Sequence, residues 1–252
     1  MMRRLLLVLA VLVVVTAAAS AWPGHSIKSY GMQVFMLKEE PDGWVAYNDC
    51  VHASADPNIT QWSGYLLDGG GFEVPSGLLK DYATGTTLPV TATLECSNVS
   101  SSLSSLPDPG TEANDIFGFF PQFGPSASYN SSSYDWYYMV TFTDLDPSAS
   151  YEFVTTANRN GSSYGGDGTN SRWTKFTIVG ADTYSNTSTP GVVEITPDVV
   201  IMNTGYNTVN GYVVRWSGIT ASDGEFTVVS ENVGQASPVE PLTWTTIKGM
   251  YR

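Results

Sequence analysis

The chain has 252 residues and a formal net charge of −13 at pH 7, because 24 Asp and Glu face only 11 Lys and Arg. A field of this sign repels phosphate backbones and anionic lipid, which argues against nucleic-acid binding and against a basic membrane-binding face. Only 14% of the residues are charged, and Ser, Thr, Gly, Asn and Tyr are abundant, as is typical of an extracellular β-protein with uncharged polar surfaces.

Residues 1–21 have the pattern of a cleaved signal peptide. Two arginines begin it, an apolar stretch spans residues 5–15, and small residues at 19–21 precede Trp22. The apolar stretch is shorter than the ~20 residues that a membrane-spanning helix needs, and no later segment is long enough. We therefore expect a secreted, extracellular protein. Its mature part, residues 22–252, would have 231 residues (252 − 21) and suits one large β-sandwich domain.

Alternating apolar and polar residues predict about eleven β-strands and no helix of ten or more residues. Residues 52–76 and 97–135 are expected to be mostly loop, and Pro89 favours an edge position or a bulge in its strand. The clearest region is 137–181, where an Asp-x-Asp-Pro turn separates the first two of three strands. The expected strands cover 32–37, 44–50, 86–96, three within 137–181, 192–195, 199–202, 211–216, 225–230 and 244–251.

This pattern predicts the fold class. Without long helices between the strands, a parallel sheet is excluded in favour of an all-β, antiparallel two-sheet sandwich of jelly-roll type. Cys50 and Cys96 are expected to form a disulfide in an exported chain, since a bridge across this loop could contribute roughly 4 kcal/mol on the chain-entropy model. The alternative is two buried free thiols in separate strands.

Several blocks of the chain resemble one family. They are LKDYATGT, GTEANDIFG, VTFTDLDPSASYEFVTTANRN, SRWTKFTIVGADTYSNTS and NTGYNTVNGYVVRWSGITASDGEFTVVSEN. Together the match covers roughly residues 44–232. The blocks resemble an uncharacterised module of bacterial secreted proteins, similar to fibronectin type III and galactose-binding-like sandwiches and often attached to extracellular metallophosphoesterases. The resemblance implies a bacterial extracellular setting without implying an activity.

The chain departs from that family at its ends. Members close on a strand resembling YxFDVFMLxE, whereas here the similar phrase SYGMQVFMLKEE precedes the domain and the C-terminus reads TWTTIKGMYR. An apolar strand left free in water would be an aggregation hazard. We therefore expect residues 29–38 to pair within the sandwich and to fill an edge of it.

Exposed aromatic side chains give the best functional hint, because sugar rings stack on Trp and Tyr faces. Strand alternation places Trp136 and Tyr138 on one face and Tyr137 on the other, and likewise separates Trp173 from the face of Phe176. Tyr137 and Trp173 are thus candidate carbohydrate platforms. The polar groups expected nearby are Asn158, Arg159, Tyr164 and Arg172. An ordinary sandwich whose second face is covered by loops is the alternative.

The remaining candidate chemistry is weaker. Oxygen ligands suited to a structural Ca²⁺ cluster in Asp108, Glu112, Asn114 and Asp115, although their spacing matches no defined calcium loop and a solvated acidic loop explains them too. Ser163 lies in a GxSxG match that lacks the strand-to-helix context of a nucleophile elbow. The turn carboxylates Asp144 and Asp146 are expected to shape the chain before Pro147.

These observations favour a non-catalytic extracellular module that binds carbohydrate or a cell-surface partner. The alternatives are a secreted hydrolase with an unrecognised site, of a phosphoesterase- or glycosidase-associated kind, and a structural adhesion or surface-layer module.

Overall fold

The structure is a computed structural model that describes residues 31–50, 56–60, 76–97, 105–121, 123, 136–158, 173–205 and 207–232. None of the helices in these ranges is long and apolar enough to cross a membrane. The expected signal peptide and the expected strand at 244–251 lie outside the described residues. The elements are β1 (Val34–Glu40), β2 (Val45–Asp49), β3 (Ser76–Lys80), β4 (Thr87–Ser97), α2 (Glu112–Phe117), β5 (Tyr137–Thr143), β6 (Ser150–Thr156), β7 (Trp173–Val179), β8 (Thr183–Asn186), β9 (Val193–Thr196), β10 (Val199–Asn203), α3 (Asn207–Asn210), β11 (Val214–Thr220) and β12 (Phe226–Asn232).

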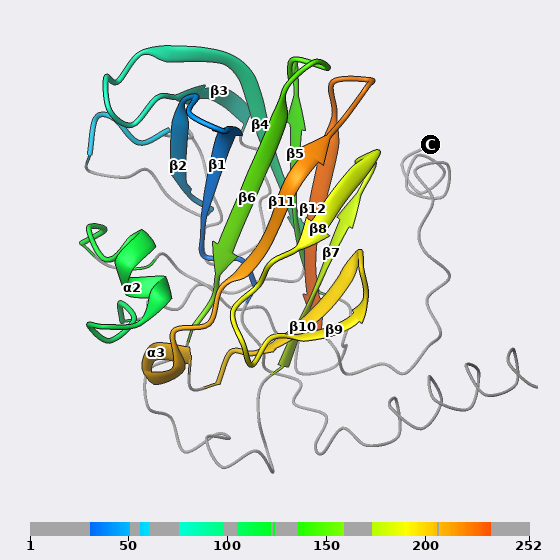
Figure 1. Ribbon diagram of the computed structural model, residues 1–252. Helices are drawn as coiled ribbons and strands as arrows, with labels where there is room; N and C mark the ends of the chain where they lie inside the picture. The colour runs from blue at the N-terminus through cyan, green and yellow to red at the C-terminus, as the bar shows by residue number, and fades with distance from the viewer. Residues whose placement is uncertain are drawn as a thin grey trace, which may run out of the picture.

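The strands form two antiparallel sheets that pack as a sandwich (Figure 1). The five-stranded sheet has the order β2-β1-β6-β11-β8, and the seven-stranded sheet has the order β3-β4-β5-β12-β7-β10-β9. The predicted all-β, antiparallel two-sheet sandwich is therefore confirmed, while its jelly-roll type stays a prediction. Pro89 lies in β4, outside the stretch that pairs with β5 and beside a register shift against β3, as expected for a bulge.

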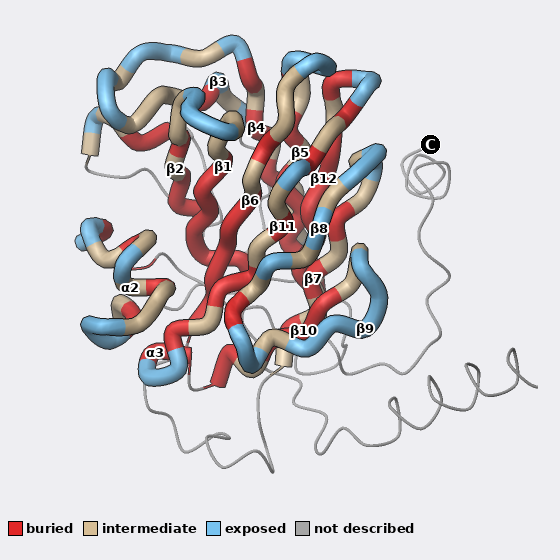
Figure 2. Tube along the Cα trace, viewed as in Figure 1, coloured by how far each residue is buried: buried red, intermediate tan, exposed pale blue. Residues whose placement is uncertain are grey.

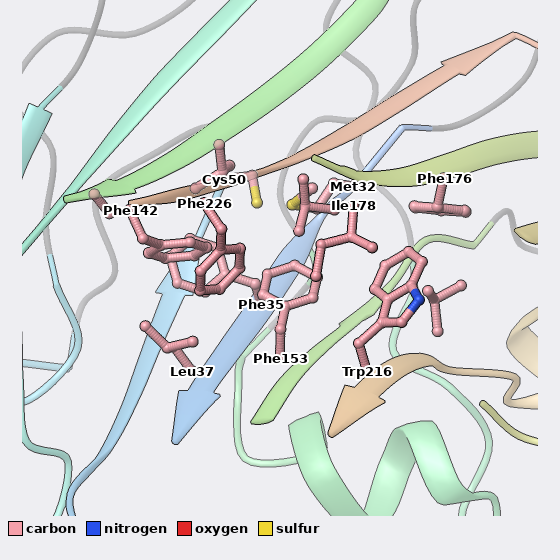
Figure 3. Close-up of a cluster of buried hydrophobic side chains, with 14 of the residues drawn as sticks. Met32, Phe35, Leu37, Cys50, Phe142, Phe153, Phe176, Ile178, Trp216 and Phe226 are labelled. Carbon is pink, nitrogen blue, oxygen red and sulfur yellow. The ribbon is translucent and has the colours of Figure 1, made fainter. Parts of the chain in front are cut away.

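Aromatic side chains from both sheets meet in the core. Phe35 of β1 contacts Phe142 of β5 edge-on, with ring centroids 5.2 Å apart, and stacks at 6.1 Å on Phe153 of β6. Phe142 also packs against Phe226 of β12 at 5.0 Å, and Phe153 packs against Trp216 of β11 at 6.5 Å. Figure 3 shows these rings gathered between the sheets. Figure 2 shows the same division along the chain, with buried residues in the strands and exposed residues in the turns and at β9.

A second apolar cluster lies on the outer side of the five-stranded sheet. Val34 and Met36 of β1 point away from Phe35 and pack with Val154 of β6 beneath Phe117 of α2. Arg215 of β11 forms an ion pair with Glu112 of α2 at 2.6 Å, which links the helix to the sheet. It also lies 3.6 Å from the carboxylate of Glu152 of β6. This sheet is thus covered on both faces over much of its area.

The segment expected to fill an edge takes a more central place. β1 pairs with β2 on one side and along all seven of its residues with β6 on the other. The prediction that this segment pairs within the sandwich is confirmed, but the edge position is wrong, since β2 forms that edge. β1 is interior because both of its faces are apolar: Phe35 and Leu37 enter the main core while Val34 and Met36 enter the outer cluster.

Removal of β1 should therefore destabilise the protein strongly. Val34, Phe35 and Leu37 are fully buried, and each such side chain contributes ~1.5–3 kcal/mol. A chain that begins at Asp42 should melt far below one that begins at Trp22, as measured by circular dichroism. A chain that begins at Gly31 is the matched control and should retain most of the stability. Equal melting temperatures for the Asp42 and Trp22 chains would contradict the role assigned to β1.

The turn between β5 and β6 is held by a tyrosine. The Tyr151 hydroxyl accepts a hydrogen bond from the Asp146 backbone N–H at 2.8 Å and donates to the Asp146 carbonyl at 3.3 Å. The Asp146 carboxylate in turn accepts from the Ser148 backbone N–H and hydroxyl, and Asp144 adopts a left-handed φ of 62°. The predicted turn-shaping role of both aspartates is confirmed. A tyrosine that bonds back to the preceding corner is similar to the tyrosine corner described for immunoglobulin-like sandwiches.

We expect Tyr151→Phe to lower the free energy of unfolding by ~1–3 kcal/mol, because the Asp146 N–H loses its partner while the ring keeps its packing against Trp44. Chemical denaturation measures this change. Tyr184→Phe, at a half-buried tyrosine of β8, is the matched control and should have a smaller effect. Equal losses in the two variants would show that the corner adds nothing specific.

Candidate functional site

The outer face of the seven-stranded sheet carries Tyr137 and Trp173, the two aromatic residues that the sequence predicts as carbohydrate platforms. Tyr137 of β5 is directly opposite Glu231 of β12, which is directly opposite Lys175 of β7. Residues paired in this way share one face, and the burial of β7 alternates strictly, with Thr174 and Phe176 buried and Lys175 half-buried. Tyr137 and Trp173 thus lie on the outer face, as predicted, but both are half-buried rather than exposed, and the Trp173 indole nitrogen is buried.

Trp173 lies on the same face two residues before Lys175. Two strand spacings and two residues of rise separate Tyr137 from Trp173, which places their Cα atoms ~12 Å apart. Between them, the Lys175 Nζ and Glu231 Oε1 form an ion pair at 2.7 Å, with 19% and 29% of the two side chains accessible. Two aromatic residues and an ion pair thus share this part of the outer face.

Hydroxyl side chains share this outer face with the carboxylate of Glu95, which lies directly opposite Met139. The hydroxyls of Thr141 and Thr227 bond across β5 and β12 at 2.9 Å, and Ser76 and Thr93 do the same across β3 and β4. Met139 is only 6% accessible although it belongs to the outer face. Other outer-face residues, such as Thr141 and Thr93, are half-buried like Tyr137 and Trp173, and Ser76 is exposed.

Of the polar residues predicted to lie beside the two aromatic residues, the structure describes one. Asn158, at the end of β6, is fully buried, and its backbone N–H donates to the Gln33 side-chain oxygen at 2.6 Å. It belongs to the five-stranded sheet side and cannot touch a ligand on the outer face of the other sheet. Arg159, Tyr164 and Arg172 lie outside the described residues, as does Ser163.

The proposed calcium ligands begin a short helix. Thr111 caps α2 by accepting the Asn114 N–H, the Asn114 amide donates to the Pro107 carbonyl at 2.9 Å, and Glu112 is engaged by Arg215. The described residues contain no group of three or more His, Cys, Asp or Glu placed to hold a metal. Asp108, Glu112 and Asp115 are therefore not gathered into a cation site here, and capping and ion pairing account for Glu112 and Asn114.

The predicted Cys50–Cys96 disulfide is wrong, because both cysteines are free. Cys50 follows β2 and is fully buried, whereas Cys96 enters the core from β4 in the other sheet. Burial, followed by the Asp49 carboxylate, raises the pKa of Cys50 well above its usual range. Burial, followed by Glu95, raises the pKa of Cys96 to about 12. Since the thiolate is the reactive form, both thiols stay inert and pack as small apolar groups.

Both thiols should consequently resist alkylation in the folded protein. At pH 8 we expect iodoacetamide to label neither cysteine at an appreciable rate, and to label both promptly in guanidinium chloride, as counted by intact mass. The same labelling without a reductant tests the pairing directly. If a denatured, unreduced sample takes up no label, the two cysteines are joined by a disulfide after all.

A second group of aromatic side chains was not predicted from the sequence. Tyr47 of β2, Tyr82 after β3 and Phe119 after α2 pack together, with Phe119 stacked 4.8 Å from Phe120. The signal available was the run IFGFFPQF, where three phenylalanines follow a short helix within residues that were expected to form loop. Its partners Tyr47 and Tyr82 are distant along the chain, so the grouping requires the fold.

The fold places the protein in the class of antiparallel two-sheet β-sandwiches. A comparison with protein-family models, with curated proteins and with solved structures found no match to the chain.

Proposed function

We propose that the protein is a non-catalytic extracellular module that binds carbohydrate through the outer face of its seven-stranded sheet. The observation that carries this proposal is the emergence of Tyr137 and Trp173 on one face, with the Lys175–Glu231 ion pair between them. Aromatic faces attract the apolar faces of sugar rings, while the ammonium and the carboxylate donate to and accept from hydroxyls.

The spacing of the two rings favours an extended ligand. A single sugar ring cannot stack on two side chains whose Cα atoms are ~12 Å apart. An oligosaccharide of several units, lying across β5, β12 and β7, can reach both.

Two features support the extracellular setting. The first 21 residues have the signal-peptide pattern, and the tyrosine corner agrees with the resemblance to fibronectin-like modules of bacterial secreted proteins. A cell-surface glycan, or a glycan-bearing partner, is the ligand that this setting makes available.

A glycan array with the purified protein, followed by affinity measurement on the best ligand, tests the proposal. Trp173→Ala should weaken binding by ~1–3 kcal/mol if a sugar stacks there, by analogy with aromatic stacking on nucleobases. Trp173→Phe keeps a ring and should retain most of the affinity. The melting temperature of each variant separates lost binding from lost folding.

Other outcomes would change the assignment. Unchanged affinity in a well-folded Trp173→Ala protein would move the site elsewhere. Hydrolysis of the bound glycan would favour a secreted hydrolase, and the absence of any glycan ligand would favour a structural adhesion module.

A further inference from the structure

The outer face of the seven-stranded sheet also holds the carboxylate of Glu95. This residue of β4 lies directly opposite Met139 of β5, two residues along from Tyr137. Its neighbours Leu94 and Cys96 turn into the main core, so the Glu95 side chain lies on the outer face. Glu95 and Tyr137 are therefore diagonal neighbours, a spacing at which long and aromatic side chains still reach one another.

Among the residues that the structure describes, Glu95 has neither a hydrogen bond nor an ion pair. The nearest ammonium group of this face belongs to Lys175, which Glu231 holds at 2.7 Å. Three strand spacings and two residues of rise separate Glu95 from Lys175, so their Cα atoms are ~16 Å apart. Lys175 therefore does not neutralise Glu95, since salt screens exposed charges over ~10 Å at 0.1 M.

Other charged side chains near this face lie toward the far end of its strands. Asp144 accepts a hydrogen bond from Thr91, which is four residues from Glu95 along β4. Lys80 ends β3, and its ammonium group donates to the Pro57 carbonyl at 2.9 Å. The described groups around Tyr137 are thus two carboxylates and one ammonium, which leaves one negative charge beside the aromatic residues.

These groups follow one diagonal across the sheet. Trp173 and Lys175 lie on β7, Glu231 on β12, Tyr137 on β5 and Glu95 on β4, and the register moves along the strands in the same sense from one end to the other. An extended ligand that contacts both aromatic residues and continues along this line reaches Glu95 next.

We infer that the ligand is a glycan with free amino groups and that Glu95 pairs with one of them. The inference rests on the proposed function, because it names the class of sugar that the same face selects. A half-buried carboxylate has lost part of its hydration, and an ammonium group that donates to it offsets that loss. An amino sugar presents this ammonium beside an apolar ring face, whereas its N-acetylated form keeps the ring face without the charge.

The probes are two chito-oligosaccharides of six units, one fully deacetylated and one fully N-acetylated. Each is titrated into the full chain by calorimetry at pH 6 and low salt, where the free amines are largely protonated. We expect the deacetylated oligosaccharide to bind ~2–5-fold more tightly, as one partly exposed ion pair provides. This advantage should shrink as salt is added.

Three variants locate the charge and the stacking. Glu95→Gln keeps the size of the side chain and should abolish the advantage of the deacetylated form. Glu194→Gln is the matched control, because it removes a carboxylate from the same sheet at a position opposite the core residue Val200, and it should leave the advantage unchanged. Trp173→Ala should weaken the binding of both oligosaccharides by a similar factor, since each has a ring face.

Equal affinity for the two oligosaccharides, with both weakened by Trp173→Ala, would overturn the inference and leave the glycan-binding proposal standing. A preference for the deacetylated form that persists in a folded Glu95→Gln protein would overturn the role of Glu95. Failure of both oligosaccharides to bind would overturn the inference, and a glycan array that is also negative would end the proposed function with it. An acetylated Gly-Lys-Gly-Lys-Gly peptide that binds as tightly as the deacetylated oligosaccharide would show that the face selects the charge without the sugar.

Discussion

The contact of Phe35 with Phe142 and Phe153 holds the two sheets together. Phe35 and Phe153 belong to the five-stranded sheet, and Phe142 belongs to the seven-stranded one, so this triad crosses the interface at its centre. Edge-to-face and stacked rings bury large apolar areas and fix the relative placement of the strands that carry them. Once Phe142 and Phe226 are committed to the core, the outward direction of every other residue in β5 and β12 follows.

The side chains that the strands turn into the core also determine which side chains face outward on both sheets. Because β5, β12 and β7 turn Tyr138, Ser230 and Phe176 inward in one row, the adjacent row of Tyr137, Glu231 and Lys175 must face outward. On the other sheet, β1 turns Phe35 inward and Val34 outward, and the helix that covers this outer side delivers Phe119 to the surface. Which aromatic side chains reach the surface therefore depends on how each strand distributes its side chains between its two faces.

Alternation within single strands was readable from the sequence. The strands around Tyr137, Tyr151, Phe176 and Phe226 were predicted nearly to the residue, because apolar residues recur at every second position between clear turn signals. β8 was missed because Thr183–Asn186 offers no such alternation, and β3 was missed because Ser76–Lys80 joins a Gly-rich run. The outward positions of Tyr137 and Trp173 follow from the same local rule.

What the sequence could not supply was long-range pairing. No local sequence pattern indicates that β1 lies between β2 and β6, or that Asn158 is buried. The cysteines show the same limit, since export and an even count suggested a bond while the fold leaves two free thiols. The aromatic group of Tyr47, Tyr82 and Phe119 likewise joins three segments that only tertiary structure brings together.

The position of β12 has a consequence for how the molecule forms. β12 lies between β5 and β7, with hydrogen bonds to both, although it is the last described strand of the chain. Until residues 226–232 arrive, β5 and β7 both expose unpaired backbone edges, which are templates for pairing with another chain. The central strand of the seven-stranded sheet is therefore added late, through contacts between segments that are far apart in the sequence. Such contacts slow folding, and the exposed edges leave the incompletely folded chain prone to aggregation.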